Sequence, residues 1–429
     1  MHRRRVAFVL IAAALLPAAA AGQTVSHRGF LEVRGVGYPQ TTASDSTRLV
    51  GEALVRHEVT AKPAPWLRLE GHADLRGDTH GQTDWGGPAL SDRSTKRPAL
   101  SIRRLDAMLA KGPVSLDLGK QFVRWGKTDI LNPTDRFAPR DYLAVVDSEI
   151  LAVTGGRLTV GLQSNALDLV AARFTPSRMP LVENRWSGIT GGPAGTAFAD
   201  GGAAHPARAQ LGARWNHVGS GFECSLSAFR GNTHLPVFAA GTPALPGGTA
   251  FPPAGPPPAG ALVGPAPIRV ARAFPEMWML GADAAVPLSP ATIKGEAAFF
   301  GSGDARAGEY WLYVIQLERQ RGEWVFVGGY AGEAVTRPRA GGAFAPDRGL
   351  AKAFLGRASY TIDAARSAAF EGAVRQTGDG AWLRFEYSQA SGRHLRLTIR
   401  ATIIGGAAGD FLGRYARNSH VTVGVRYSY

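Results

Sequence analysis

The chain has 429 residues, of which 48 are Lys or Arg and 34 are Asp or Glu, so its net charge is +14. Charged residues make up only 19% of the chain, and Cys224 is the sole cysteine, which excludes an intramolecular disulfide. A positive excess of this size is typical of nucleic-acid-binding proteins, but here basic residues alternate with acidic ones along the chain. We therefore expect no nucleic acid as a partner.

Residues 1–22 predict a cleaved secretory signal peptide. Three arginines at positions 3–5 precede an unbroken apolar run over 6–16, and small residues at 20–22 provide a cleavage site before Gln23. The run is too short to span a bilayer and Pro17 ends it, so a retained anchor is the less favoured alternative. Removing the three leader arginines lowers the net charge to +11, and residues 23–429 are predicted to form a single domain.

Hydrophobicity alternates with a period of two along most of the mature chain. In the segment 393–403, for example, Leu395, Leu397 and Ile399 lie on one face, and Arg396 and Arg400 lie on the other. This alternation predicts strands with one face suited to lipid and the other suited to water. No window after the leader contains eighteen consecutive apolar residues, so we expect no membrane helix there.

About eighteen such segments of nine to fourteen residues follow one another, a length that crosses a hydrocarbon layer when the strands are tilted. Tight links at 61–64, 111–112, 219–220, 287–290 and 390–392 alternate with longer links, and only 378–380 breaks that length rule. The pattern predicts an all-β fold: a transmembrane antiparallel β-barrel of 16–18 strands with short periplasmic turns and long extracellular loops. The segments start near Arg28, Thr47, Pro65, Ala99, Pro113, Glu149, Ala166, Arg208, Gly221, Ala271, Ala291, Glu309, Glu323, Leu350, Ser367, Ala381, Arg393 and Ser419.

The last ten residues, HVTVGVRYSY, end in an aromatic residue, Tyr429, and place valines and tyrosines on one face. This ending is similar to the terminal assembly signal of Gram-negative outer-membrane barrels. An open edge strand in lipid would be very costly, so we expect closure against a first strand near residues 30–38. The expected partners are outer-membrane lipid, lipopolysaccharide and, through Tyr429, the barrel assembly machinery.

A barrel of about eighteen strands is too wide for its side chains to fill, so we expect an aqueous lumen. The alternation assigns fourteen basic and twelve acidic side chains to this lumen, which is close to balance. Late in the chain, Arg384, Arg396, Arg400 and Arg426 predict a locally basic strip that favours anionic groups. The alternative is that Arg–Glu pairs only cross-link neighbouring strands.

Two long links differ in character. Residues 232–270 contain ten prolines and no acidic residue, which predicts a mobile external cover without a core of its own. The second, residues 124–149, belongs largely to the stretch GKQFVRWGKTDILNPTDRFAPRDYL at 119–143. We expect it to fold inward as a constriction that contacts solutes through Arg124, Trp125, Lys127, Asp129, Asp135, Arg136, Arg140 and Asp141.

Two other interpretations of this stretch stay open. Asp129, Asp135 and Asp141 could bind a cation, although their six-residue spacing fits no standard calcium loop, so we predict no metal site. In the structural interpretation, Pro133 and Pro139 fix the path, aspartates cap turns, and Arg–Asp pairs tie the segment to the wall.

The pattern Gly-Lys-Gln, Trp-Gly, Asn-Pro-x-Asp and Pro-Arg-Asp-Tyr within 119–142, followed by FTPSRMP at 174–180 and RW at 185–186, resembles a known signature. It is that of a poorly characterised family of Gram-negative outer-membrane, porin-like β-barrel proteins. The resemblance implies an outer-membrane location and a pore-type fold, and it supplies no catalytic residue and no substrate.

The sequence therefore predicts a porin-like channel for passive or weakly selective diffusion of small polar solutes, with no cofactor, and it is compatible with an oligomer. One alternative is a non-conducting barrel that binds a partner or serves export. A less favoured alternative is an outer-membrane hydrolase, because the sequence contains neither Gly-x-Ser-x-Gly nor His-Glu-x-x-His and no catalytic residue is predicted.

Overall fold

The computed structural model describes residues 24–181, 184–187, 198–240, 268–339 and 345–429. The predicted signal peptide lies outside the described residues, as does the 241–267 part of the predicted external cover. Two short helical turns are present in the described residues, α1 (Pro346–Gly349) and a 3-10 turn η1 (Gly413–Asn418). Neither is long and apolar enough to cross a membrane.

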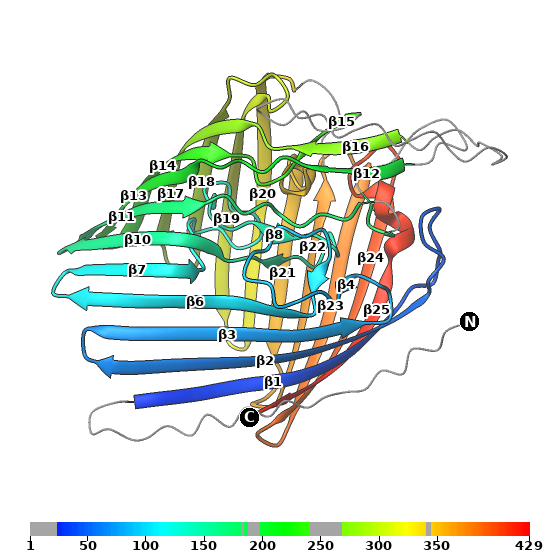
Figure 1. Ribbon diagram of the computed structural model, residues 1–429, viewed down its shortest axis with the longest axis horizontal. Helices are drawn as coiled ribbons and strands as arrows, with labels where there is room; N and C mark the ends of the chain where they lie inside the picture. The colour runs from blue at the N-terminus through cyan, green and yellow to red at the C-terminus, as the bar shows by residue number, and fades with distance from the viewer. Residues whose placement is uncertain (1–23, 182–183, 188–197, 241–267, 340–344) are drawn as a thin grey trace.

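Eighteen long antiparallel strands form one closed barrel (Figure 1), which confirms the predicted fold class and strand number. Each barrel strand pairs with the next in the chain, and the last pairs with the first. The strands are β1 (Thr24–Gly37), β2 (Leu49–Ala64), β3 (Leu67–Asp78), β6 (Leu100–Lys111), β7 (Val114–Gln121), β10 (Val153–Leu162), β11 (Asn165–Arg173), β13 (Ala209–Gly219), β14 (Phe222–Asn232), β17 (Glu276–Pro287), β18 (Thr292–Gly301), β19 (Glu309–Arg321), β20 (Trp324–Arg337), β21 (Ala353–Thr361), β22 (Arg366–Arg375), β23 (Gly380–Ser391), β24 (Leu395–Gly406) and β25 (His420–Ser428).

The barrel closes where β1 meets β25. The register runs from Phe30 opposite Ser428 to Gly37 opposite Val421, and the backbones of Gly29 and Tyr429 exchange two hydrogen bonds of 3.0 Å. Every predicted segment corresponds to a strand, and no predicted start lies more than five residues from the observed one. The predicted closure near residues 30–38 is confirmed.

Short links gather at one rim of the barrel, the turn rim, and long links gather at the other, the loop rim. The link 376–379 is the short exception at the loop rim, as predicted. The prediction of a turn at 61–64 is wrong, because β2 continues to Ala64 and the turn lies at Pro65 and Trp66. A register shift between Ala61 and Ala64 accommodates Pro63, which cannot donate a ladder hydrogen bond.

The two faces of the barrel wall differ in polarity as the alternation predicts. Outward side chains such as Leu226, Leu280 and Ile315 are exposed, whereas inward neighbours such as Ser225 and Asp283 are buried. Cys224 alternates with Ser225 and shares the outward face with Leu226. Since soluble monomers rarely expose continuous apolar surface, this outer band fits lipid.

Seven short strands lie in the loop-rim links. β12 (Phe198–Ala203), β15 (Val237–Ala240) and β16 (Ile268–Ala273) form a three-stranded sheet beyond the barrel strands (Figure 1). The described ends of the 232–270 link are thus strands, and Val237 and Val270 are buried, so these ends do contribute to a core. β4 (Thr83–Asp84) pairs with β5 (Arg97–Pro98), and β8 (Arg140–Asp141) pairs with β9 (Glu149–Ile150).

Candidate functional site

The link between β7 and β10, residues 122–152, is called the inward segment here because its side chains meet inward-facing residues of the barrel wall. At its start, Trp125 packs edge-to-face on Phe137 at 5.3 Å, and Phe137 packs in the same way on Phe229 of β14 at 5.2 Å. A Cβ atom on Gly212 of β13 would lie 2.5 Å from the Phe137 ring. The wall therefore needs a glycine where the segment approaches it.

One buried wall carboxylate anchors the next part of the segment. Glu296 of β18 accepts hydrogen bonds from the backbone N–H of Lys127 (3.0 Å), from the N–H and hydroxyl of Thr128 (3.3 and 2.9 Å), and from the N–H and hydroxyl of Thr134 (2.7 and 2.9 Å). Charge-assisted hydrogen bonds are stronger than neutral ones, so these donors compensate the burial of Glu296. The tight chain path around Asn132 and Pro133 brings both threonines to the same carboxylate.

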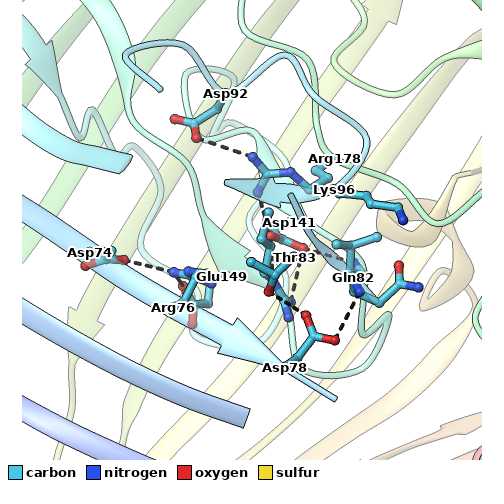
Figure 2. A network of polar contacts seen from close by, with 12 residues as sticks. Asp74, Arg76, Asp78, Gln82, Thr83, Asp92, Lys96, Asp141, Glu149 and Arg178 are labelled. Carbon is cyan, nitrogen blue, oxygen red and sulfur yellow. Dashed lines mark hydrogen bonds and ion pairs between the residues drawn. The ribbon is translucent and has the colours of Figure 1, made fainter. Parts of the chain in front are cut away.

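A buried ion-pair network holds the middle of the segment (Figure 2). Asp141 accepts hydrogen bonds from Arg97 at 2.9 Å and from Arg178 at 2.6 Å, and Arg178 also lies 3.4 Å from Asp92. Arg97 and Asp92 come from the link 79–99, and Arg178 follows β11. Burial alone would raise the pKa of Asp141, but the two guanidinium groups outweigh burial and lower that pKa well below its usual range.

Towards the end of the segment, Asp147 lies between two arginines of the opposite wall. Its carboxylate is 3.2 Å from Arg400 of β24 and 3.6 Å from Arg384 of β23. Burial opposes the ionisation of Asp147, but Arg384, Arg400 and the more distant Arg34 outweigh it, so the pKa is lowered. Asp147 is therefore an anion at neutral pH.

Glu149 faces the other side, towards β3 and β6. Its carboxylate is 3.0 Å from Arg103 and 3.9 Å from Arg76. Burial would raise the pKa of Glu149, but Arg76 and Arg103 outweigh it and lower the pKa. The end of the segment thus presents two carboxylates to arginines on both sides of the lumen.

Two cavities lie on either side of this point. The loop-side cavity, of about 580 Å³, is lined by the inward segment and by loop-rim residues that include His234, Arg306, Tyr310 and Phe411. The wall cavity, of about 390 Å³, lies against β1–β3 and β23–β25. Both cavities are lined by Asp147, Ser148 and Glu149, so this tripeptide forms their common boundary.

Solved structures with the same architecture exist at low sequence identity. The BenF-like porin from Pseudomonas fluorescens Pf-5 matches with a TM-score of 0.52 and 12% identity over 95% of this chain and 98% of its own. Acinetobacter baumannii OccAB4 matches with a TM-score of 0.54 and 9% identity over 95% and 99%. Pseudomonas aeruginosa OccK2 (OpdF), solved in complex with glucuronate, matches with a TM-score of 0.50 and 11% identity over 95% and 96%.

This chain has a porin fold. No protein-family model matches the sequence, and no curated protein is significantly similar to it in sequence. The likeness therefore concerns the barrel and its connectivity, and the residues of the lumen have to be interpreted from their own geometry.

Within this porin fold, five of the eight residues predicted for the constriction line the loop-side cavity: Arg124, Asp129, Asp135, Arg136 and Arg140. The other three lie elsewhere. Trp125 is buried in the aromatic cluster, Lys127 pairs with Glu223 of the wall, and Asp141 belongs to the buried ion-pair network.

The three aspartates of the motif have separate partners. Asp129 pairs with Lys294 at 3.0 Å, Asp135 accepts the N–H of Trp125 at 3.1 Å, and Asp141 binds two arginines. Among the described residues, no three His, Cys, Asp or Glu side chains are placed to hold a metal ion, and these three aspartates do not converge on one point. Burial raises the pKa of Asp135 to about 6, although the Trp125 N–H opposes the shift.

The four arginines of the predicted basic strip are neighbours on β23–β25. Arg396 lies opposite Arg426 in the register. Arg426 pairs with Glu32, Arg400 with Glu386 at 2.7 Å, and Arg396 donates to the hydroxyl of Ser388 at 2.9 Å. Arg396, Arg400 and Arg426 line the wall cavity, and Arg384 lines the loop-side cavity.

Cross-strand ion pairs also run along the rest of the inner wall. Arg56 pairs with Asp74 at 2.7 Å, and Arg157 pairs with Asp168 at 2.8 Å on neighbouring strands. Such pairs are what the strand-linking interpretation requires. They also leave the wall close to electroneutral, so a local excess of charge depends on residues that the inward segment adds.

Asp147 and Glu149 were not singled out from the sequence. Both fall within the predicted 124–149 link, where two acids flank a serine at the start of β9. The sequence did offer one signal for these two acids: neither has an oppositely charged residue two positions away, so each needs a partner from another part of the chain. No such signal indicated that Arg97 and Asp92 belong to the ion-pair network around Asp141, because their position depends on how the link 79–99 enters the barrel.

Proposed function

We propose that the protein is an outer-membrane channel for passive or weakly selective diffusion of small polar solutes. The observation that supports this most strongly is the pair of cavities, both lined by charged side chains, that meet at Asp147, Ser148 and Glu149 inside a closed barrel with an apolar exterior. A solute would cross the loop-side cavity, pass the tripeptide and continue through the wall cavity.

The charges of the lumen favour weak selectivity with a local preference for anionic groups. Most wall arginines have an acidic partner on a neighbouring strand, which limits the net field. Two arginines of the basic strip lack such a strand partner: Arg396 has only a hydroxyl partner among its described contacts, and Arg384 pairs with Asp147 of the inward segment. Glucuronate, which is bound in the OccK2 structure, is a suitable first test solute because it is small, polar and anionic.

The location and partners follow from the two ends of the chain and from its outer surface. The proposed leader at 1–22 exports the chain, the apolar outer band contacts outer-membrane lipid and lipopolysaccharide, and the aromatic end at Tyr429 engages the barrel assembly machinery. In the folded barrel, Tyr429 lies 3.3 Å from the His57 ring nitrogen at the turn rim, where an amphipathic side chain suits the membrane interface.

A non-conducting barrel that binds a partner is the second candidate. The observation that favours it is the three-stranded sheet of β12, β15 and β16, which lies at the loop rim beyond the barrel strands (Figure 1). This sheet would then be a binding platform, and the inward segment would act as a plug.

Reconstitution into planar bilayers tests the proposal. Refolded protein should give stepwise conductance in KCl, and liposomes that contain it should swell in small neutral sugars and in sodium glucuronate. Vesicles that received detergent and heat-denatured protein are the control. A folded barrel that shows neither conductance nor swelling would contradict the channel and favour the binding platform.

A further inference from the structure

Asp147 lies at the point where a solute would pass from the loop-side cavity to the wall cavity. Arg384 lines the loop-side cavity and Arg400 lines the wall cavity, and the Asp147 carboxylate contacts both. An ion that moves from one cavity to the other therefore passes an ion-pair bridge of three side chains.

The three members of this bridge differ in how firmly they are held. Arg400 also donates two hydrogen bonds to Glu386, at 2.7 and 2.8 Å, and Arg384 also donates to the backbone oxygen of Val146. Asp147 is the one carboxylate within 4.0 Å of Arg384 among the described residues. Its side chain retains 35% of its exposure, so water reaches the carboxylate and can replace its contacts.

Asp147 thus occupies a site that would otherwise take an anion. Two guanidinium groups converge on one carboxylate, and guanidinium groups are suited to bind carboxylates and other oxyanions. The occupant is tethered to the inward segment, so its local concentration at the two arginines is high without any solute present.

We propose that Asp147 is a built-in competitor for an anion site formed by Arg384 and Arg400, and that the carboxylate or other oxyanion group of a passing solute displaces it. This inference rests on the proposed channel function. When Asp147 is displaced, the bridge between the cavities opens and the solute anion is held by the same two guanidinium groups. The site therefore favours anionic solutes while it restricts the leak of simple ions.

The test uses single-channel recording of the full-length protein and of Asp147→Asn, which keeps the shape and removes the charge. The matched control is Asp363→Asn, because Asp363 also pairs with an arginine, Arg366, but lies in an exposed turn and lines neither cavity. Two quantities are measured: the chloride-to-potassium permeability ratio in a KCl gradient, and the sodium glucuronate concentration that halves the chloride current.

Asp147→Asn should raise the permeability ratio and lower the half-blocking concentration by about fivefold, the size expected when a partly exposed ion pair no longer competes for the site. Asp363→Asn should behave as the natural protein. Unchanged values in Asp147→Asn, or no glucuronate block in either protein, would overturn the inference. The channel proposal would still stand in either case, because it requires only that the protein conducts.

A second variant protects the test against a folding defect. Arg384→Gln removes the arginine that has no other carboxylate partner among the described residues, and it should raise the half-blocking glucuronate concentration in an otherwise natural chain. Block that is the same in Arg384→Gln as in the natural protein would also overturn the inference. Absence of conductance in the natural protein would instead refute the channel function itself.

Discussion

Substitution of Asp141 by Asn should release the inward segment from the neighbouring loop-rim links, which supply Arg97 and Arg178, without unfolding the barrel. Asp141 is almost fully buried between Arg97 and Arg178, which are buried as well. Removing one partner of a buried ion pair generally costs about 3 to 5 kcal/mol because an uncompensated charge remains. Arg178 keeps Asp92 at 3.4 Å and Arg97 keeps Glu52 at 3.6 Å, so we expect the lower end, about 3 kcal/mol.

Hydrogen exchange measures this cost locally. The N–H of Tyr142 donates to Arg178 and the N–H of Arg178 donates to Arg140, so both amides report on the network. A loss of about 3 kcal/mol corresponds to exchange that is faster by about two orders of magnitude, since 1.4 kcal/mol is a factor of ten.

The matched control for this substitution is Asp168→Asn. Asp168 is also buried and also pairs with an arginine, but it lies on the β11 wall and away from the inward segment. Exchange at Tyr142 and Arg178 should not change in this variant. If Asp141→Asn left these amides as protected as Asp168→Asn does, the network would not be what holds the segment.

Three further perturbations address other contacts of the same region. Because burial raises the pKa of Asp135 from 3.8 to about 6, the folded state binds this proton more tightly, and the stability of the segment should fall by about 3 kcal/mol as pH rises from about 4 to about 6. Amide exchange around Trp125 as a function of pH should show this loss, and Asp135→Asn should abolish it. Gly212→Val should displace Phe137 from the wall, because a Cβ atom there would lie 2.5 Å from its ring, and the expected result is higher conductance, whereas Gly35→Val, at an open outward position, should have no such effect. Deletion of Tyr429 should lower the yield of assembled barrel in cell membranes with little change in refolding from urea, and an unchanged yield would contradict the assembly role.

The barrel could be predicted from the sequence because its wall obeys a purely local rule. Every wall strand must alternate between lipid and water, and a short turn must follow every second strand, so each segment carries its own signal. The error at 61–64 has the same origin. A proline normally marks the end of a strand, but β2 absorbs Pro63 in an irregular register and continues to Ala64.

The site could be predicted only in part, because its contacts join distant parts of the chain. The motif at 119–143 indicated an unusual link, and five of its candidate residues do line a cavity. Its most conspicuous residue, Trp125, is instead a buried anchor. The partners that give Asp141 and Asp147 their different roles come from the link 79–99 and from β23 and β24, and no local pattern connects these segments.

Asp141 and Asp147 of the inward segment differ in burial, and this difference separates a permanent ion pair from one that a solute can displace. The Asp141 side chain retains 3% of its exposure and is enclosed by Arg178 with 3% and Arg97 with 11%, so any solute anion would have to enter a nearly dry, filled site. The Asp147 side chain retains 35% and contacts arginines of two open cavities. Since the penalty for separating an ion pair rises steeply as water is excluded, Asp141 stays paired while Asp147 can exchange its partners for water or for a solute. The inward segment thus narrows the wide lumen with two different contacts. The carboxylate of Asp141 fixes the segment in place, and the carboxylate of Asp147, six residues further along the chain, can be displaced.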